Sequence, residues 1–154
     1  MNGKTLKIYV DTSVFGGCHD AEFFRESMAF FHEIKKRKGQ LYISEIVLRE
    51  LAKAPLSVRN ILNEFPRNQL NLIEIDQEVV ELRNYYLKAG VVSKKWVDDA
   101  THVAAATVAR VDAIVSWNFR HIVKLDKMKR YNLENIIHGY GVMTIISPRE
   151  VLGE

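Results

Sequence analysis

The sequence predicts an α/β protein with a mainly parallel sheet of five strands. Short apolar segments alternate along the chain with longer segments of helical periodicity, which is typical of βαβ units. The first apolar segment, Leu6 to Val10, has little polar relief, as expected for a strand buried on both faces of a parallel sheet. In such sheets the functional residues lie beyond the carboxyl ends of the strands.

In the first half of the chain, a helix is expected over residues 21–38, because its phenylalanines recur on one side and Gly39 follows as a stop. A short strand over residues 41–43 comes next. Ser44 then suits the N-cap of a helix that runs to about Lys53, and Ser57 begins another short helix towards Phe65.

In the second half, residues 70–75 predict a third strand, after which Asp76 caps a helix that Gly90 closes. The alanine-rich segment 97–110 predicts a helix that can lie close to a sheet. Strands over residues 113–116 and 143–146 complete the set, and Pro148 ends the last one. We expect right-handed crossovers between the strands.

Composition limits the class of protein. The 154 residues fit one domain, 1–154, that can bury a core. A single cysteine, Cys18, excludes an internal disulfide and fits a reducing cytoplasm. The first apolar run, Leu6 to Val10, is too short for a signal peptide or a membrane span, and we expect a cytoplasmic protein without a membrane partner. The net charge of +3 permits a phosphate-rich partner without establishing one.

Acidic residues follow the first two strands. Asp11 comes directly after the first, in Y-V-D-T-S, where an ordinary turn or N-cap is the alternative interpretation. Glu50 lies on the helix after the second, where the alternative is a solvated glutamate. Glu45, in the first turn of that helix, competes with Glu50, although the helix dipole alone explains an acid at that position.

Two further polar positions lie later in the chain. Asp98 and Asp99 begin the alanine-rich helix, and one of them could be only a cap. His102, three residues after Asp99, is expected to be a hydrogen-bonded structural residue that can orient an acid. Asn118 follows the fourth strand, where it could also be a turn residue.

Together these residues predict a cation site. Carboxylates brought close together repel one another unless a cation neutralises them. Oxygen ligands prefer hard cations such as Mg²⁺ or Mn²⁺, which can activate water and stabilise a phosphate. An enzyme that forms an aspartyl phosphate on Asp11 fits less well, because it usually needs a second acid two residues on, where Ser13 stands.

Four motifs, in order, resemble the PIN domain family, and more narrowly its VapC-like toxins. They are Y-V-D-T-S-V-F-G-G, S-E-I-V-L-R-E-L, D-D-A-T-H-V-A-A-A and V-D-A-I-V-S-W-N-F-R-H-I-V. The resemblance covers nearly the whole chain. It implies a PIN-like α/β/α sandwich, a metal-dependent endoribonuclease of a type II toxin–antitoxin pair, an RNA substrate, a separate antitoxin protein and a homodimer.

The resemblance also implies roles for individual residues. Asp11, Glu50 and Asp99 would hold Mg²⁺ or Mn²⁺, and Asn118 would complete the catalytic set. Asn118 departs from the family, which usually has aspartate there in T-x-D, whereas Ser116 fits the hydroxyl position of that motif. The departure leaves open a second hypothesis, a PIN-fold module that binds RNA or a protein partner without cutting.

Basic residues after Asn118 are candidates for RNA binding. Arg120, Lys124 and Lys127 follow it closely, so they can flank the acidic site and hold the phosphate backbone. The alternative is a solvated surface run. Lys94 and Lys95 precede Trp96 in another basic segment.

Overall fold

A computed structural model describes residues 5–153, and its centre is the sheet. Four parallel pairings join the strands in the order β3-β2-β1-β4-β5, so the sheet is wholly parallel where the sequence predicted a mainly parallel one. The strands are β1 (Lys7–Val10), β2 (Gln40–Ser44), β3 (Leu70–Ile73), β4 (Ala113–Val115) and β5 (Thr144–Ile146). The α/β prediction with five strands is confirmed.

The order of the strands reverses at the centre of the sheet. The chain lays β2 and β3 to one side of β1, then crosses to the other side for β4 and β5. Val10 therefore pairs with Val115, and both strands end together. The residues that follow β1 and β4 emerge side by side at a switch point, where parallel sheets form their binding crevices.

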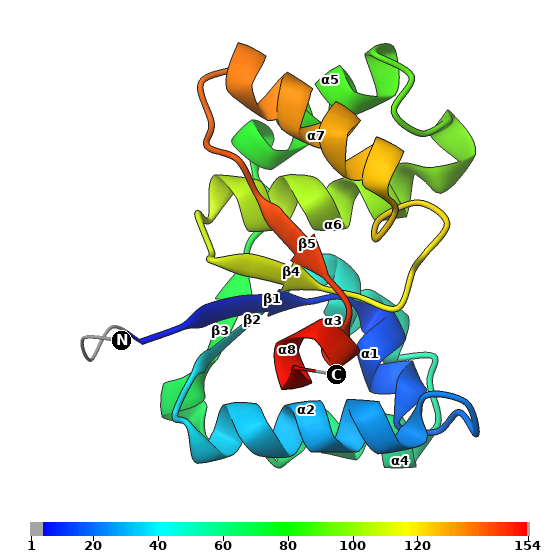
Figure 1. Cartoon of the computed structure of the whole chain (residues 1–154), viewed down its shortest axis with the longest axis vertical. Coiled ribbons are helices and arrows are strands. Elements are labelled where there is room, and N and C mark those ends of the chain that lie inside the picture. The colour runs from blue at the N-terminus through cyan, green and yellow to red at the C-terminus, as the bar shows by residue number, and fades with distance from the viewer. Residues whose placement is uncertain (1–4, 154) are drawn as a thin grey trace.

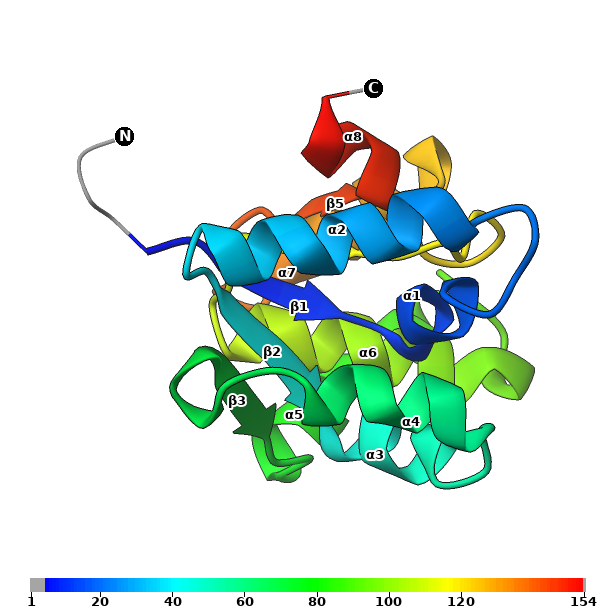
Figure 2. The same ribbon diagram turned by 90° about the horizontal axis from the view of Figure 1, so that it is seen from below.

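Helices cover both faces of the sheet. In Figure 1, α5, α6 and α7 lie on one side of it, and α2, α4 and α8 lie on the other; Figure 2 shows α2 and α6 on opposite sides of β1. In chain order the helices are α1 (Thr12–Gly17), α2 (Phe24–Lys36), α3 (Glu45–Leu51), α4 (Leu56–Asn63), α5 (Gln77–Lys88), α6 (Val97–Val108), α7 (Leu125–Ile137) and α8 (Pro148–Leu152), with short 3₁₀ turns η1 (Arg67–Gln69) and η2 (Lys94–Trp96).

The core explains the apolar segments. Ile8, Tyr9 and Val10 are all buried, which is why β1 shows no polar alternation. On α6, the alanines at 104–106 are completely buried, and their small side chains allow the helix to lie close to the sheet. Asp76 caps α5 as predicted, since its carboxylate accepts a hydrogen bond from the backbone N–H of Val79 at 3.1 Å.

The sequence did not predict three helices: α1, α7 and α8. In α7 only Tyr131 and Asn135 are buried, while several apolar side chains are exposed, so apolar periodicity does not mark its inner face. The helix is held by Tyr131, which belongs to the buried core, and by polar contacts, among them the hydroxyl of Tyr86, which donates to Asn135 Oδ1 at 2.5 Å. Among the described residues, no helix has the length and apolar character needed to cross a membrane.

Candidate active site

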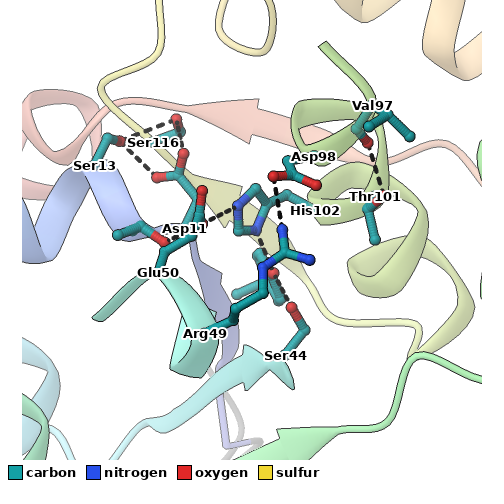
Figure 3. Close-up of polar contacts among 12 residues, drawn as sticks. Asp11, Ser13, Ser44, Arg49, Glu50, Val97, Asp98, Thr101, His102 and Ser116 are labelled. Carbon is teal, nitrogen blue, oxygen red and sulfur yellow. Dashed lines mark hydrogen bonds and ion pairs between the residues drawn. The ribbon is translucent and has the colours of Figure 1, made fainter. Parts of the chain in front are cut away.

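Asp11 lies where the central strand ends. It occupies the N-cap position of α1, but its side chain does not cap the helix. Its carboxylate instead accepts hydrogen bonds from the hydroxyls of Ser13 at 2.6 Å and Ser116 at 3.0 Å, as Figure 3 shows. The side chain is almost fully buried, so the interpretation of Asp11 as an ordinary helix cap does not describe its contacts.

The two serines are fixed as donors to Asp11. Ser13 Oγ accepts from the backbone N–H of Trp117 at 2.9 Å, and Ser116 Oγ accepts from that of Asn118 at 2.9 Å. Because an ionised carboxylate can only accept, each hydroxyl directs its own proton at Asp11. The loop after β4 thereby orients Asp11 across the switch point.

Burial raises the pKa of Asp11 above its ordinary value. The charge of His102 and the hydrogen bonds from Ser13 and Ser116 act in the opposite direction, while the negative charge of Asp99 raises it further. A carboxylate whose ionised form is disfavoured by burial and by a second carboxylate is stabilised by a cation. The local electrostatics therefore favour a positively charged ligand.

Glu50, on α3, points to the same region. Its Oε1 atom accepts from the Thr12 hydroxyl at 2.5 Å and lies 3.0 Å from Nε2 of His102. Burial acts to raise the pKa of Glu50, but the contacts with His102 and Thr12 outweigh it and lower the pKa. Glu45 has a different task, since its carboxylate accepts from the backbone N–H of Ile75 at 2.5 Å. The structure thus separates the two glutamates that the sequence left in competition.

His102 joins Glu50 to the core. Its ring is buried, and Nδ1 lies 2.7 Å from the hydroxyl of Tyr9, which in turn lies 2.9 Å from the hydroxyl of Ser44. Burial alone would lower the pKa of His102, but the hydrogen bond to Glu50 and the nearby carboxylates raise it. The expected role of His102, that of a hydrogen-bonded residue that orients an acid, agrees with these contacts.

Replacing His102 by phenylalanine is expected to lower the free energy of unfolding by about 1–3 kcal/mol, because the ring volume stays and the hydrogen bonds are lost. The contribution of His102, whose folded pKa is raised, is present below its ordinary value of 6.5 and is lost as the pH rises through the folded pKa. That of Glu50, whose folded pKa is lowered, is present above its ordinary value of 4.5 and is lost as the pH falls. The difference between parent and variant should be largest between these two values.

Urea unfolding with a chelator present, repeated across that pH range, measures this difference. A suitable control is His138→Phe, since the ring of His138 is more exposed than that of His102 and its contact with Glu134 is longer, at 3.5 Å, so it should contribute less. Equal losses for the two variants, or a difference without pH dependence, would contradict the role given to His102.

Asp99 and Asp98, both in the first turn of α6, have different surroundings. Asp98 forms an ion pair with Arg49 at 2.7 Å, which joins α6 to α3. The pKa of Asp99 is raised by burial and by the charges of Glu50 and Asp98, and a hydrogen bond with Asn118 opposes the rise. Asp99 is therefore the acid of this pair that is electrostatically coupled to the other carboxylates.

Asn118 uses its side-chain oxygen within its own loop. Its Oδ1 atom accepts from the backbone N–H groups of Arg120 at 3.2 Å and His121 at 3.0 Å. This carbonyl oxygen is thus already engaged by two backbone amides. Asn118 acts in this structure as the residue that shapes the loop, and its side chain acts to lower the pKa of Asp99.

A cavity of about 450 Å³ opens beside these residues. Its acidic and amide lining consists of Glu50, Asp98, Asp99 and Asn118, and Asp11 is buried next to them. The remaining lining consists of Lys95, Trp96, Arg120 and His121. Sequence reasoning did not assign Trp96 or His121 to the site, although the basic residues before Trp96 were a signal.

The three predicted RNA-binding residues are not equivalent. Arg120 lines the cavity, and Lys124 is exposed at the N-cap of α7. The ammonium of Lys127 donates to the carbonyl oxygen of Val91 at 2.6 Å. All three nevertheless act on His121. Burial lowers the pKa of His121 most, and the positive charges of the three residues lower it further.

The donors at the site suit a hard cation in their chemistry. Carboxylate oxygens of Asp11, Glu50 and Asp99 are the type of ligand that Mg²⁺ and Mn²⁺ take. Among residues 5–153, however, the structure shows no group of three or more His, Cys, Asp or Glu side chains that could hold a metal ion in their present positions. The ligand set therefore stays a prediction, supported by donor chemistry and by the mutual charge effects.

The five-stranded parallel sheet with helices on both faces matches a PIN-like fold, and comparison with solved structures agrees. The chain is similar to a chain in the crystal structure of VapBC2 from Rickettsia felis bound to a DNA fragment from their promoter. The TM-score is 0.52 at 14% sequence identity, over 92% of this chain and 98% of that chain. At this identity the likeness shows the fold. No protein-family model matches the chain, and a comparison with curated protein sequences found no match.

Proposed function

We propose that this protein is a metal-dependent endoribonuclease that acts as the toxin of a type II toxin–antitoxin pair in the cytoplasm. The observation that carries the proposal is the electrostatic effect of these acids on one another near the switch point: the charge of Asp99 raises the pKa of Asp11, and the charge of Glu50 raises that of Asp99. The PIN-like fold and the four motifs support the same function.

In this proposal Asp11, Glu50 and Asp99 hold Mg²⁺ or Mn²⁺. When bound, such an ion supplies an activated water and stabilises charge on the phosphate. Ser13 and Ser116 orient Asp11, and His102 and Thr12 orient Glu50. No side chain is required as a nucleophile, because water attacks the phosphodiester.

The remaining residues of the cavity bind the substrate. Arg120 places a positive charge beside the acids, where it can hold an RNA phosphate and bring the scissile bond to them. Asn118 holds the backbone amides of Arg120 and His121 and so positions this part of the loop. We further propose a separate antitoxin protein, which the likeness to the VapBC2 structure supports, and a homodimer, which rests on the resemblance of the motifs alone.

The proposal is tested by RNA cleavage in the presence of a chelator and after addition of Mn²⁺ or Mg²⁺. Structured RNAs with unpaired loops should be cut internally only when the metal is added. Cleavage that continues at the same rate in excess chelator would exclude the metal-dependent mechanism.

One observation favours a second candidate, a module that binds RNA without cutting it. Asn118 brings no charge where aspartate is usual in the resembled family, and its oxygen is engaged by two backbone amides. A protein that binds RNA but cuts nothing in excess Mn²⁺ would establish this alternative and exclude the nuclease.

The basic residues make a prediction about salt. Replacing Arg120 or Lys124 by alanine should weaken RNA binding across sequences and reduce the slope of log K against log salt by about 0.7 for each lost contact with single-stranded RNA. Lys127→Ala should change the slope less, because its ammonium already donates to Val91. Anisotropy titrations at several salt concentrations measure these slopes. Slopes equal to that of the parent for the alanine variants of Arg120 and Lys124 would show that neither residue contacts an RNA phosphate.

A further inference from the structure

One wall of the cavity combines an aromatic ring with two cations. The indole of Trp96 packs against the imidazole of His121, with ring centroids 4.3 Å apart and planes 27° apart. The ammonium of Lys95 lies 5.1 Å from the centre of the indole, and Arg120 lines the same cavity. Within the described part of the chain, neither Lys95 nor Arg120 forms an ion pair with a carboxylate.

The elements that carry the acids also hold this wall in place. Trp96 ends η2 and occupies the N-cap position of α6, three residues before Asp99. His121 belongs to the loop after β4. Its backbone N–H donates to Asn118 Oδ1 at 3.0 Å, and its backbone carbonyl oxygen accepts from the hydroxyl of Tyr131 at 2.9 Å. The aromatic pair therefore has a fixed position beside the carboxylates.

Such a wall is chemically suited to a flat π system that carries a neighbouring negative charge. Bases of single-stranded nucleic acids stack on aromatic side chains, and lysine and arginine contact the adjoining phosphates. A lysine ammonium near an indole is a weak contact at an exposed position, and the side chain of Lys95 is exposed and flexible. A base can therefore replace this contact while Lys95 moves to a phosphate.

We propose that Trp96 is the stacking platform of a nucleotide subsite that takes one unpaired RNA base beside the phosphate to be cut, with Lys95 and Arg120 on the flanking phosphates. This inference rests on the proposed function and narrows its substrate to RNA that is unpaired at the cut. A base inside a duplex is already paired and stacked on its neighbours, so paired RNA can present it to the indole only at the cost of unpairing and unstacking it.

The second tryptophan makes the subsite observable. Trp117 is buried, its ring NH donates to Ser27 Oγ at 2.8 Å, and it stacks on Phe23, so a ligand in the cavity does not reach it. Trp96 is only partly buried. A base that stacks on Trp96 should quench part of the protein fluorescence and leave the contribution of Trp117.

The experiment measures binding with a chelator present, so that no cleavage is needed. The probes are a labelled single-stranded ribonucleotide decamer of mixed sequence, the same sequence as a duplex, and a decamer of abasic sugar phosphates. Trp96→Leu keeps apolar bulk, and Trp96→Phe keeps an aromatic ring. The control is Tyr85→Leu, because Tyr85 is also exposed and stacked on a histidine, His138, with centroids 3.5 Å apart, but lies outside the cavity lining.

Trp96→Leu should weaken binding of the single strand by about tenfold, whereas Trp96→Phe should recover most of the affinity and Tyr85→Leu should leave it unchanged. The single strand should quench parent fluorescence, and the duplex and abasic decamers should not. Equal affinity of Trp96→Leu and parent, or equal binding of the base-containing and abasic strands, would overturn the subsite.

Separate measurements of RNA binding and RNA cleavage distinguish a failure of the nucleotide subsite from a failure of the proposed nuclease activity. If Trp96→Leu loses affinity but the parent cuts nothing in Mn²⁺, the subsite stands and the nuclease fails. If the parent cuts single-stranded RNA while Trp96→Leu binds and cuts it as well as the parent, the nuclease stands and the subsite fails. Thermal melts of the three variants show whether a loss of binding reflects a loss of folding.

Discussion

Replacing Asp99 by asparagine should slow RNA cleavage by more than about a hundredfold, since even residues that only support a metal ligand cost 10–100-fold when changed. The substitution keeps the shape of the side chain and removes a charge that the cation needs. Asp11→Asn should behave in the same way. Initial rates of cleavage of one labelled RNA in saturating Mn²⁺ measure both effects.

The neighbouring acid provides a matched control. Asp98→Asn removes the same charge one residue away, but Asp98 is paired with Arg49 and is nearly half exposed. We expect it to change the rate only a few-fold. On α3, Glu45→Gln is the corresponding control for Glu50→Gln, because the carboxylate of Glu45 accepts from the backbone amide of Ile75. Parent-like rates for Asp99→Asn or Asp11→Asn would show that the residue concerned is not a ligand.

Asp99→Asn should not weaken the metal-free fold, whereas Asp11→Asn also sets an amide NH₂ group against one of the two serine hydroxyls that donate to Asp11. Burial raises the folded-state pKa of both Asp99 and Asp11, so the folded protein binds their protons more tightly than the unfolded chain does. Stability of the parent therefore falls as the pH rises from the ordinary aspartate value of 3.8 through the raised folded pKa. Without metal, Asp99→Asn should equal or exceed the parent in stability at neutral pH, and this advantage should disappear in acid.

Much of the fold could be predicted from the sequence, because the pattern that marks each strand also causes its burial. Residues 6–10 read as a strand covered on both faces, and β1 is the central strand of the sheet. Helix α7 could not be predicted in this way. Its buried residues, Tyr131 and Asn135, are positioned by hydrogen bonds to other elements, which no local periodicity records.

For the candidate site, the sequence predicted positions better than contacts. Asp11 and Asn118 follow the parallel strands β1 and β4, which end together, while Glu50, Asp99 and Asn118 line one cavity. The contacts of Glu50 with Thr12 and His102 join residues 38 and 52 positions apart. No spacing rule predicts such pairs, and the roles of these residues as ligands stay predictions.

The substitution Asn118→Asp should tighten Mn²⁺ binding by about tenfold to a hundredfold, because it adds a negative charge beside Asp99. The new carboxylate can maintain the conformation of the loop, since one of its oxygens can still accept from the backbone amides of Arg120 and His121. Its other oxygen replaces the amide group whose hydrogen bond lowers the pKa of Asp99. Without metal the variant should therefore be less stable than the parent at neutral pH, and Mn²⁺ should stabilise it more.

The number of bound ions follows from the same charges. One divalent ion largely neutralises three ionised carboxylates, and a second leaves an excess of positive charge until an RNA phosphate arrives. We therefore expect one ion in the free parent protein and a tighter site in Asn118→Asp. Calorimetric titration with Mn²⁺ in the absence of RNA tests this, with Asn84→Asp as the control because Asn84 is exposed on α5 and adds the same charge elsewhere. Two tight sites in the parent, or equal affinities in parent and Asn118→Asp, would contradict the expectation.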